Sequence, residues 1–274
     1  MSDSPLCGVL GTFRKNACSA MWTLIGFGTQ HTFASHLVEL EICEPMLVDD
    51  DTRTAAEAEL REGIGKADFP CVGAKSALAR GTLKTLVCHS LRSGWDDVKI
   101  HRELMEWARE YRANSEGLRS LAVVFSGPDE LTEKEFENLM WERIQSFADK
   151  DHWLGQPYDH RVSADPDDPH FSLSFGGEAF FVVGLHPNAS RPARRFPRPT
   201  LVFNLHSQFE SLREEGKYER MRERILERDA ALAGSINPML AKHGEASEAR
   251  QYSGRVIDKG WECPFRDKRA TEAI

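Results

Sequence analysis

The sequence predicts an α+β fold in which an antiparallel β-sheet is covered by helices within a single domain. Two observations support this prediction. Short β-like segments come as hairpins, and helices follow them without the regular strand and helix alternation of a doubly wound sheet. The 274 residues are 41% hydrophobic and 28% charged, a composition typical of a globular chain that buries a substantial core.

The first 45 residues differ from the rest of the chain. Glycines interrupt short apolar pieces there, and no helical or strand period is sustained. These glycines are Gly8, Gly11, Gly26 and Gly28. We therefore expect an N-terminal extension of undefined structure over residues 1–45 and one domain over residues 46–274.

The first half of the domain is predicted to contain three helices and two strands. Apolar residues at helical intervals indicate the helices, Gly81 ends the second of them, and two β-like runs indicate the strands. The expected elements are helices over about 52–65, 74–80 and 95–111, and strands over about 83–89 and 118–125.

The second half begins with the clearest helix signal. Thr132 and Glu135 form a capping box ahead of apolar residues at helical spacing. A hairpin across Gly176-Gly177, a further strand and a long charged helix bent at Gly216 are expected next. The charges of this helix, at three-residue spacing, predict a solvated face. The predicted ranges are about 171–175, 179–185, 200–203 and 206–232.

Charge and hydropathy exclude several classes of partner. With 35 basic and 43 acidic residues, the net charge of −8 gives no general attraction to nucleic acid or to anionic membranes. No apolar run approaches the roughly 20 residues that span a bilayer, and no secretory signal is recognisable. We expect a cytoplasmic protein that binds neither nucleic acid nor membrane.

The cysteines are widely spaced and contain no C-x-x-C pair, which excludes the usual zinc and iron–sulfur spacings. They are Cys7, Cys18, Cys43, Cys71, Cys88 and Cys263. We interpret them as reduced thiols. Cys263 precedes a proline, as in haem–thiolate sites, although a buried structural thiol is the alternative interpretation.

The densest group of unusual residues runs from position 184 to 209. His186 lies where an apolar strand meets a proline, and His206 follows the next strand, so either imidazole is a candidate metal ligand. A histidine that packs at a strand end and bonds to backbone is the alternative for each.

Four arginines also fall in this segment: Arg191, Arg194, Arg195 and Arg198. In an acidic protein, such a local cluster indicates an anion site, because guanidinium groups pair with carboxylate or phosphate in a bidentate manner. The alternative is that these arginines pair with the protein's own carboxylates.

Six stretches of the chain carry a resemblance. They are 69–75, 185–191 with 194–197, 201–209, 234–240, 247–254 and 263–265. Their order and content resemble the successive motifs of the YqcI/YcgG family over about residues 66–265. Residues 1–45 fall outside this resemblance, and residues 46–274 are expected to form a YqcI/YcgG-like haem-binding domain.

The resemblance implies a haem-dependent oxygenase that N-hydroxylates a guanidino group of arginine or of an arginine-derived metabolite. Haem b, dioxygen and an external electron donor are the implied cofactors and co-reactants. The candidate iron ligands are, in order of preference, His186, His206 and Cys263. Arg191, Arg194 and Arg195 are the candidates for the haem propionates.

A guanidinium substrate requires a carboxylate within hydrogen-bond reach. The candidates near the motifs are Glu178, Glu245 and Glu248, and Phe203, Phe209 and Trp261 are expected to line the pocket. The alternative function is a haem-free α+β module that binds an anionic metabolite or partner. A hydrolase lacks motif support, since no G-x-S-x-G sequence occurs.

Overall fold

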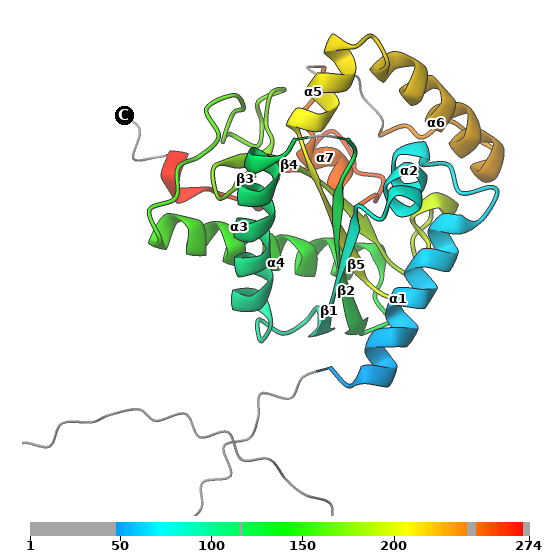
Figure 1. Cartoon of the computed structure of the whole chain (residues 1–274), viewed down its shortest axis with the longest axis horizontal. Coiled ribbons are helices and arrows are strands. Elements are labelled where there is room, and N and C mark those ends of the chain that lie inside the picture. Colours follow the sequence, from blue (N-terminus) through cyan, green and yellow to red (C-terminus); the bar gives the residue numbers. More distant parts are fainter. Residues whose placement is uncertain (1–47, 116, 240–244, 271–274) are drawn as a thin grey trace, which may run out of the picture. The chain divides into compact units, whose positions relative to one another are not determined.

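The computed structural model describes residues 48–115, 117–239 and 245–270 (Figure 1). The predicted extension over residues 1–45 lies outside the described residues. Within the described part, five strands form one sheet in the order β1-β2-β5-β4-β3. The strands are β1 (Leu83–Ser90), β2 (Ser120–Gly127), β3 (Leu173–Phe175), β4 (Glu178–Leu185) and β5 (Thr200–Leu205).

The pairing of the strands confirms the predicted α+β class. β2 with β5, β5 with β4 and β4 with β3 are antiparallel, so most of the sheet is antiparallel as expected. β1 and β2 are parallel, which differs from the expected antiparallel arrangement of the sheet at this one pair. Helix α3 (Asp97–Ala113) supplies the crossover that a parallel pair needs.

Helices α1, α2 and α4 lie close to their predicted positions, whereas the short helix α7 was not predicted. α4 begins with the expected capping box, in which the Glu135 amide donates to the Thr132 hydroxyl at 3.2 Å and the Thr132 amide donates to the Glu135 carboxylate at 2.9 Å. The helices are α1 (Asp50–Gly65), α2 (Val72–Arg80), α4 (Glu133–Trp153), α5 (Ser207–Glu214), α6 (Tyr218–Ala233) and α7 (Ala249–Tyr252).

Helices cover both faces of the sheet because its interior strand β2 is apolar on both sides. In β2, Leu121, Val123 and Phe125 belong to the core that the sheet shares with α3 and α4. Ala122 and Val124 point to the opposite face and belong to the core that includes α1 and α2. This alternation follows from the two-residue period of a strand.

The charged segment predicted as one bent helix over 206–232 forms two helices instead. α5 ends at Glu214 and α6 starts at Tyr218. Gly216 lies between them with φ of 65°, in the left-handed region that favours glycine. The expected bend is therefore a complete break, because a residue with this backbone conformation cannot continue an α-helix.

α6 packs against α2 and against the 3-10 turn Pro192–Arg194. Among the described residues of α6, Asp229 alone is buried. The helix is therefore loosely packed on the domain, and several of its side chains line a pocket instead of a core. α5 and α6 follow each other along the chain (Figure 1), and both contribute residues to the lining of the candidate site. Among the helices that the structure describes, none is both long enough and apolar enough to cross a membrane.

Candidate functional site

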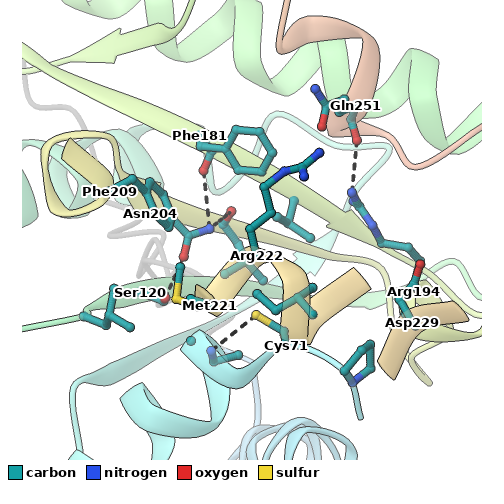
Figure 2. A pocket seen from close by; sticks show the side chains of 18 of the residues that line it. Cys71, Ser120, Phe181, Arg194, Asn204, Phe209, Met221, Arg222, Asp229 and Gln251 are labelled. Carbon is teal, nitrogen blue, oxygen red and sulfur yellow. Dashed lines mark hydrogen bonds between the residues drawn. The ribbon is translucent and has the colours of Figure 1, made fainter. Parts of the chain in front are cut away.

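A pocket of about 310 Å³ lies on the face of the sheet that α1 and α2 cover (Figure 2). This central pocket is bounded by the sheet, by α2, α5 and α6, and by the 3-10 turn after β4. Its lining is mostly apolar and includes Phe69, Val183, Val202, Phe209, Met221 and Ile225. Its volume and apolar character are typical of sites for small organic molecules.

His206 lies on the wall of the central pocket. It follows β5 and precedes the first residue of α5, and its backbone amide donates to the Ala179 carbonyl at 2.8 Å. The residue is 8% exposed. This strand-to-helix junction therefore fixes an imidazole ring at the edge of the pocket, as required of a ligand to a metal or of a proton-transfer group.

Glu248 also lines the central pocket, and one of its oxygens lies 3.5 Å from Nε2 of His206. The other carboxylate oxygen accepts from the Ser172 hydroxyl at 3.2 Å and from the Tyr252 hydroxyl at 3.4 Å. Burial raises the pKa of Tyr252 well above its ordinary value, so its hydroxyl keeps its proton and remains a donor. The Glu248 carboxylate is thus held through the oxygen that does not face His206.

Arg194 is a partly buried cation on the pocket wall. Its guanidinium donates to the carbonyls of Gly184, Tyr252 and Gln251 at 3.0 to 3.1 Å, and it forms no ion pair with any described carboxylate. Desolvation lowers its pKa to about 10, which leaves it charged at neutral pH. Its direct partners are therefore carbonyl oxygens, and the nearby charge of Asp229 offsets part of the desolvation without forming an ion pair.

Arg222 is a second cation of the central pocket. Figure 2 shows its side chain extending from α6 into the space beneath the helix. It is partly buried, and its guanidinium makes no hydrogen bond or ion pair with another described residue. The pocket therefore holds two guanidinium groups, Arg194 and Arg222, that lack a carboxylate partner and are suited to an anionic ligand.

The other arginines of the predicted cluster have partners within the protein. Arg191 lines the pocket, but its Nε donates to Asp229 at 2.9 Å. Arg198 pairs with Glu59 at 2.7 Å. Arg195 is exposed and donates to two backbone carbonyls in its own loop, outside the pocket. Arg191 and Arg198 therefore pair with carboxylates of the protein, as the alternative interpretation expected, whereas Arg194 remains a candidate for an anion site.

His186, the first candidate for an iron ligand, lies outside the central pocket. Its ring stacks on Phe136 of α4 with centroids 4.4 Å apart, and the residue is 1% exposed. Nδ1 has no hydrogen-bond partner among the described residues. Burial lowers the pKa of His186 to about 4, so the ring is neutral at physiological pH.

Cys263, the third candidate, is also outside the pocket. It belongs to the core on the opposite face of the sheet, together with Trp141 and Phe265. Burial raises the pKa of its thiol to about 12, so it stays protonated and lacks the thiolate that binds iron. Phe203 lies in the same core and Trp261 packs against it, whereas Phe209 lines the pocket as expected.

Two of the three predicted substrate carboxylates lie away from the pocket. Glu178 forms ion pairs with Arg161 at 2.8 Å and with Arg112 at 3.5 Å. Glu245 is exposed and is not part of the pocket lining. Glu248 is the predicted carboxylate that the fold brings to the pocket. Among the described residues, no group of three or more His, Cys, Asp or Glu side chains is arranged to hold a metal ion.

Sequence reasoning missed Arg222 because the charges of its helix predicted a solvated face. A signal was present: Met221, Ile225 and Leu226 form an apolar stripe next to it, and all of them line the pocket. Cys71 was quoted within a motif without a role. It lines the pocket, where burial raises the pKa of its thiol.

The fold and the site define an α+β protein with an apolar pocket that carries an imidazole and two guanidinium groups without carboxylate partners. Residues 60–266 match the model of the YqcI/YcgG family. The chain therefore belongs to the YqcI/YcgG family, as its motifs predicted. No curated protein and no solved structure matched it.

Proposed function

We propose that this chain is a haem-dependent oxygenase that N-hydroxylates a guanidino group of arginine or of an arginine-derived metabolite. The observation that carries the proposal is the combination, in one apolar pocket, of a buried imidazole and two guanidinium groups without carboxylate partners. The family resemblance supplies the expected reaction, and the pocket supplies residues of the types that the cofactor needs.

The central pocket contains the types of side chain that a haem site needs: an imidazole, two guanidinium groups and an apolar lining. His206 would be the ligand to the iron, which reverses the order predicted from sequence, since His186 stacks on Phe136 outside the pocket. Arg194 and Arg222 would hold the two propionates, because guanidinium groups pair well with carboxylates. Apolar side chains from the sheet and from α6 would pack against the ring and exclude water.

When bound, haem would supply the activation of dioxygen, which no side chain of the protein performs. The overall reaction inserts one oxygen atom at a guanidino nitrogen and releases the other as water, with two electrons from the external donor and two protons. The tasks of this chain are then to hold the cofactor, orient the substrate nitrogen and keep bulk water out.

A haem-free module that binds an anionic metabolite is the second candidate function. The same two arginines favour it, because their charges would neutralise any dicarboxylate or phosphate of suitable size. The two candidates differ in whether the pocket takes up haem.

Absorption spectra of the protein produced with ample haem supply test the proposal. We expect a Soret band that shifts on reduction with dithionite and again on addition of carbon monoxide. The loaded protein, supplied with dioxygen and an electron donor, is then expected to add one oxygen atom to arginine or a related guanidine, as seen by mass spectrometry. A featureless spectrum after addition of haemin would contradict the proposal and favour the haem-free module.

A further inference from the structure

The ring of His206 lies between two carboxylates of different character. Nε2 is 3.5 Å from Glu248 and Nδ1 is 3.7 Å from Glu210. A ligand that binds one ring nitrogen of His206 must therefore displace one of these acids, and the other acid stays beside the remaining nitrogen.

Glu248 is the acid that the protein holds in place. Its side chain is 13% exposed, and its second oxygen lies within hydrogen-bond reach of the hydroxyls of Ser172 and Tyr252. Both hydroxyls can also donate to the Phe180 carbonyl, and the charged carboxylate is the stronger acceptor. Ser172 lies just before β3 and is fully buried, and Tyr252 belongs to α7 and is also fully buried. Because both donors are fixed in the core, Glu248 has little freedom to leave His206.

Glu210 is the acid that can leave. Its side chain is 44% exposed, and it forms an ion pair with Arg213 on the same helix. Arg213 is itself held over the Tyr218 ring at 4.2 Å. Glu210 therefore keeps a partner and access to water when its contact with His206 is broken, and the cost of displacing it is low.

We propose that Glu248 is a positioning residue that fixes the ring of His206 and increases its electron donation to bound iron. This inference rests on the proposed function, since it takes His206 as the residue that would bind the iron. An imidazole whose N–H donates to a carboxylate is a more basic ligand, which stabilises ferric over ferrous iron. Glu248 would thereby lower the reduction potential of the haem, and Glu210 would have little influence.

Matched variants of the two acids test this assignment. Glu248→Gln and Glu210→Gln each remove one negative charge beside the same ring and keep the side-chain length. We expect Glu248→Gln to shift the ferric/ferrous midpoint potential to a more positive value and to weaken haem binding about tenfold or more. Glu210→Gln is expected to leave both quantities close to those of the wild type.

Spectroelectrochemical titration of the haem-loaded proteins gives the readout. An unchanged potential in Glu248→Gln, or an equal or larger shift in Glu210→Gln, would overturn the assignment while leaving the proposed function intact. Absence of haem binding in the wild type would instead overturn the proposed function.

A second variant keeps the inference testable if Glu248→Gln does not fold. Ser172→Ala removes one donor to Glu248 and retains the charge. A carboxylate that has lost a donor accepts more strongly from His206, so the expected midpoint potential is more negative than that of the wild type. An unchanged potential in Ser172→Ala would count against the role of Glu248.

Discussion

At the scale of single residues, Arg194 and Arg222 differ in how their charge is supported. Arg194 donates to three backbone carbonyls and thus also joins β4 to the segment around α7. Arg222 makes no such contact with the described residues and extends into the pocket from one side of α6. Arg222 is therefore the cation whose removal tests ligand binding with the least effect on the fold.

Replacing Arg222 by alanine is expected to weaken haemin binding about tenfold, or about 1.4 kcal/mol, because one charge-assisted contact to a propionate is lost. Arg224→Ala on the exposed side of the same helix is the control and is expected to bind haemin as the wild type does. Fluorescence or absorption titration measures both. Equal affinities in the two variants would show that Arg222 does not bind the anion.

His186 gives the stability of the protein a defined pH dependence. Its pKa is lowered to about 4 in the folded state, against about 6.5 when unfolded, because the buried ring stacks on Phe136 away from water. Below pH 6.5 the unfolded state takes up a proton that the folded state does not. Stability is therefore full above pH 6.5 and falls as the pH drops toward 4, by up to about 3 kcal/mol.

Urea unfolding at pH 7.5 and pH 4.5 tests this dependence. In His186→Asn we expect the difference in free energy of unfolding between the two pH values to be about 2–3 kcal/mol smaller than in the wild type. His160→Asn, at an exposed position, controls for the loss of a histidine in general. The same pH difference in wild type and His186→Asn would contradict the account.

The sequence identified part of the candidate site and not the rest. His206, Arg194 and Glu248 were named, because their motifs bring unusual residues to the ends of β5, β4 and α7. His186 and His206 both follow a strand, and only the packing of the sheet decides which of the two rings faces the pocket. The position of a residue at a strand end does not reveal this. Arg222 was missed because the packing of α6 decides which of its charges point inward.

At the scale of elements, the break between α5 and α6 depends on the backbone of Gly216. Its φ is 65°, and no atom lies within 4 Å of the position that a Cβ would occupy. Gly65, at the end of α1, also has open space around that position but lacks a positive φ. Alanine has room at both positions, so a different effect of the two substitutions reports the backbone conformation of Gly216 and not a steric clash.

We expect Gly216→Ala to lower the free energy of unfolding by about 1 kcal/mol, because alanine is strained in the left-handed region. Gly65→Ala is expected to raise it by about 0.5–1 kcal/mol, since alanine restricts the unfolded chain and favours the helix. Chemical denaturation measures both changes. A stabilising effect of Gly216→Ala would refute the strained conformation.

The elements themselves were largely predictable, and their pairing was not. The capping box at Thr132 and the glycines around the hairpin mark local boundaries that follow from backbone chemistry. The parallel pairing of β1 with β2 depends on contacts between distant segments, which local patterns do not encode. The strand, helix and strand of this segment were predicted, and the parallel pairing of the two strands was missed.

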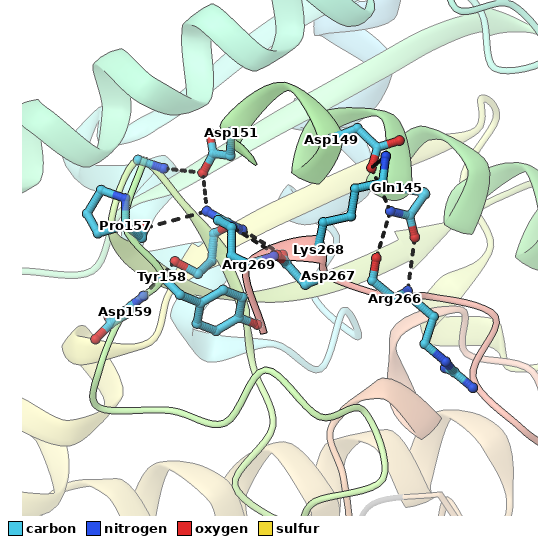
Figure 3. A network of polar contacts seen from close by, with 12 residues as sticks. Gln145, Asp149, Asp151, Pro157, Tyr158, Asp159, Arg266, Asp267, Lys268 and Arg269 are labelled. Carbon is cyan, nitrogen blue, oxygen red and sulfur yellow. Dashed lines mark hydrogen bonds and ion pairs between the residues drawn. The ribbon is translucent and has the colours of Figure 1, made fainter. Parts of the chain in front are cut away.

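At the scale of the whole domain, a buried ionic network ties the C-terminal segment to the body of the protein (Figure 3). Asp151 of α4 is fully buried and lies 2.6 Å from His101 of α3 and 2.8 Å from Arg269. The Gly176 amide of the β3–β4 turn donates to the same carboxylate at 2.8 Å. One side chain thus joins two helices, the hairpin and the chain end.

Replacing Asp151 by asparagine is expected to lower the free energy of unfolding by about 3–5 kcal/mol, because it leaves Arg269 buried with an incomplete set of acceptors. Asp149→Asn removes an exposed partner of Lys268, two residues earlier in α4, and is expected to cost less than about 1 kcal/mol. Urea denaturation monitored by circular dichroism compares the two variants. Similar losses in both would show that the network does not hold the C-terminal segment.

The assignment of His206 as the haem ligand is tested most directly by haemin titration of the wild type, His206→Ala and His186→Ala, with spectra recorded in the ferric, ferrous and carbon monoxide-bound forms. We predict that the wild type and His186→Ala bind haemin with an imidazole-type spectrum, and that His206→Ala loses this spectrum or binds far more weakly. Unchanged spectra in His206→Ala, or their loss in His186→Ala, would contradict the placement of the haem in the central pocket.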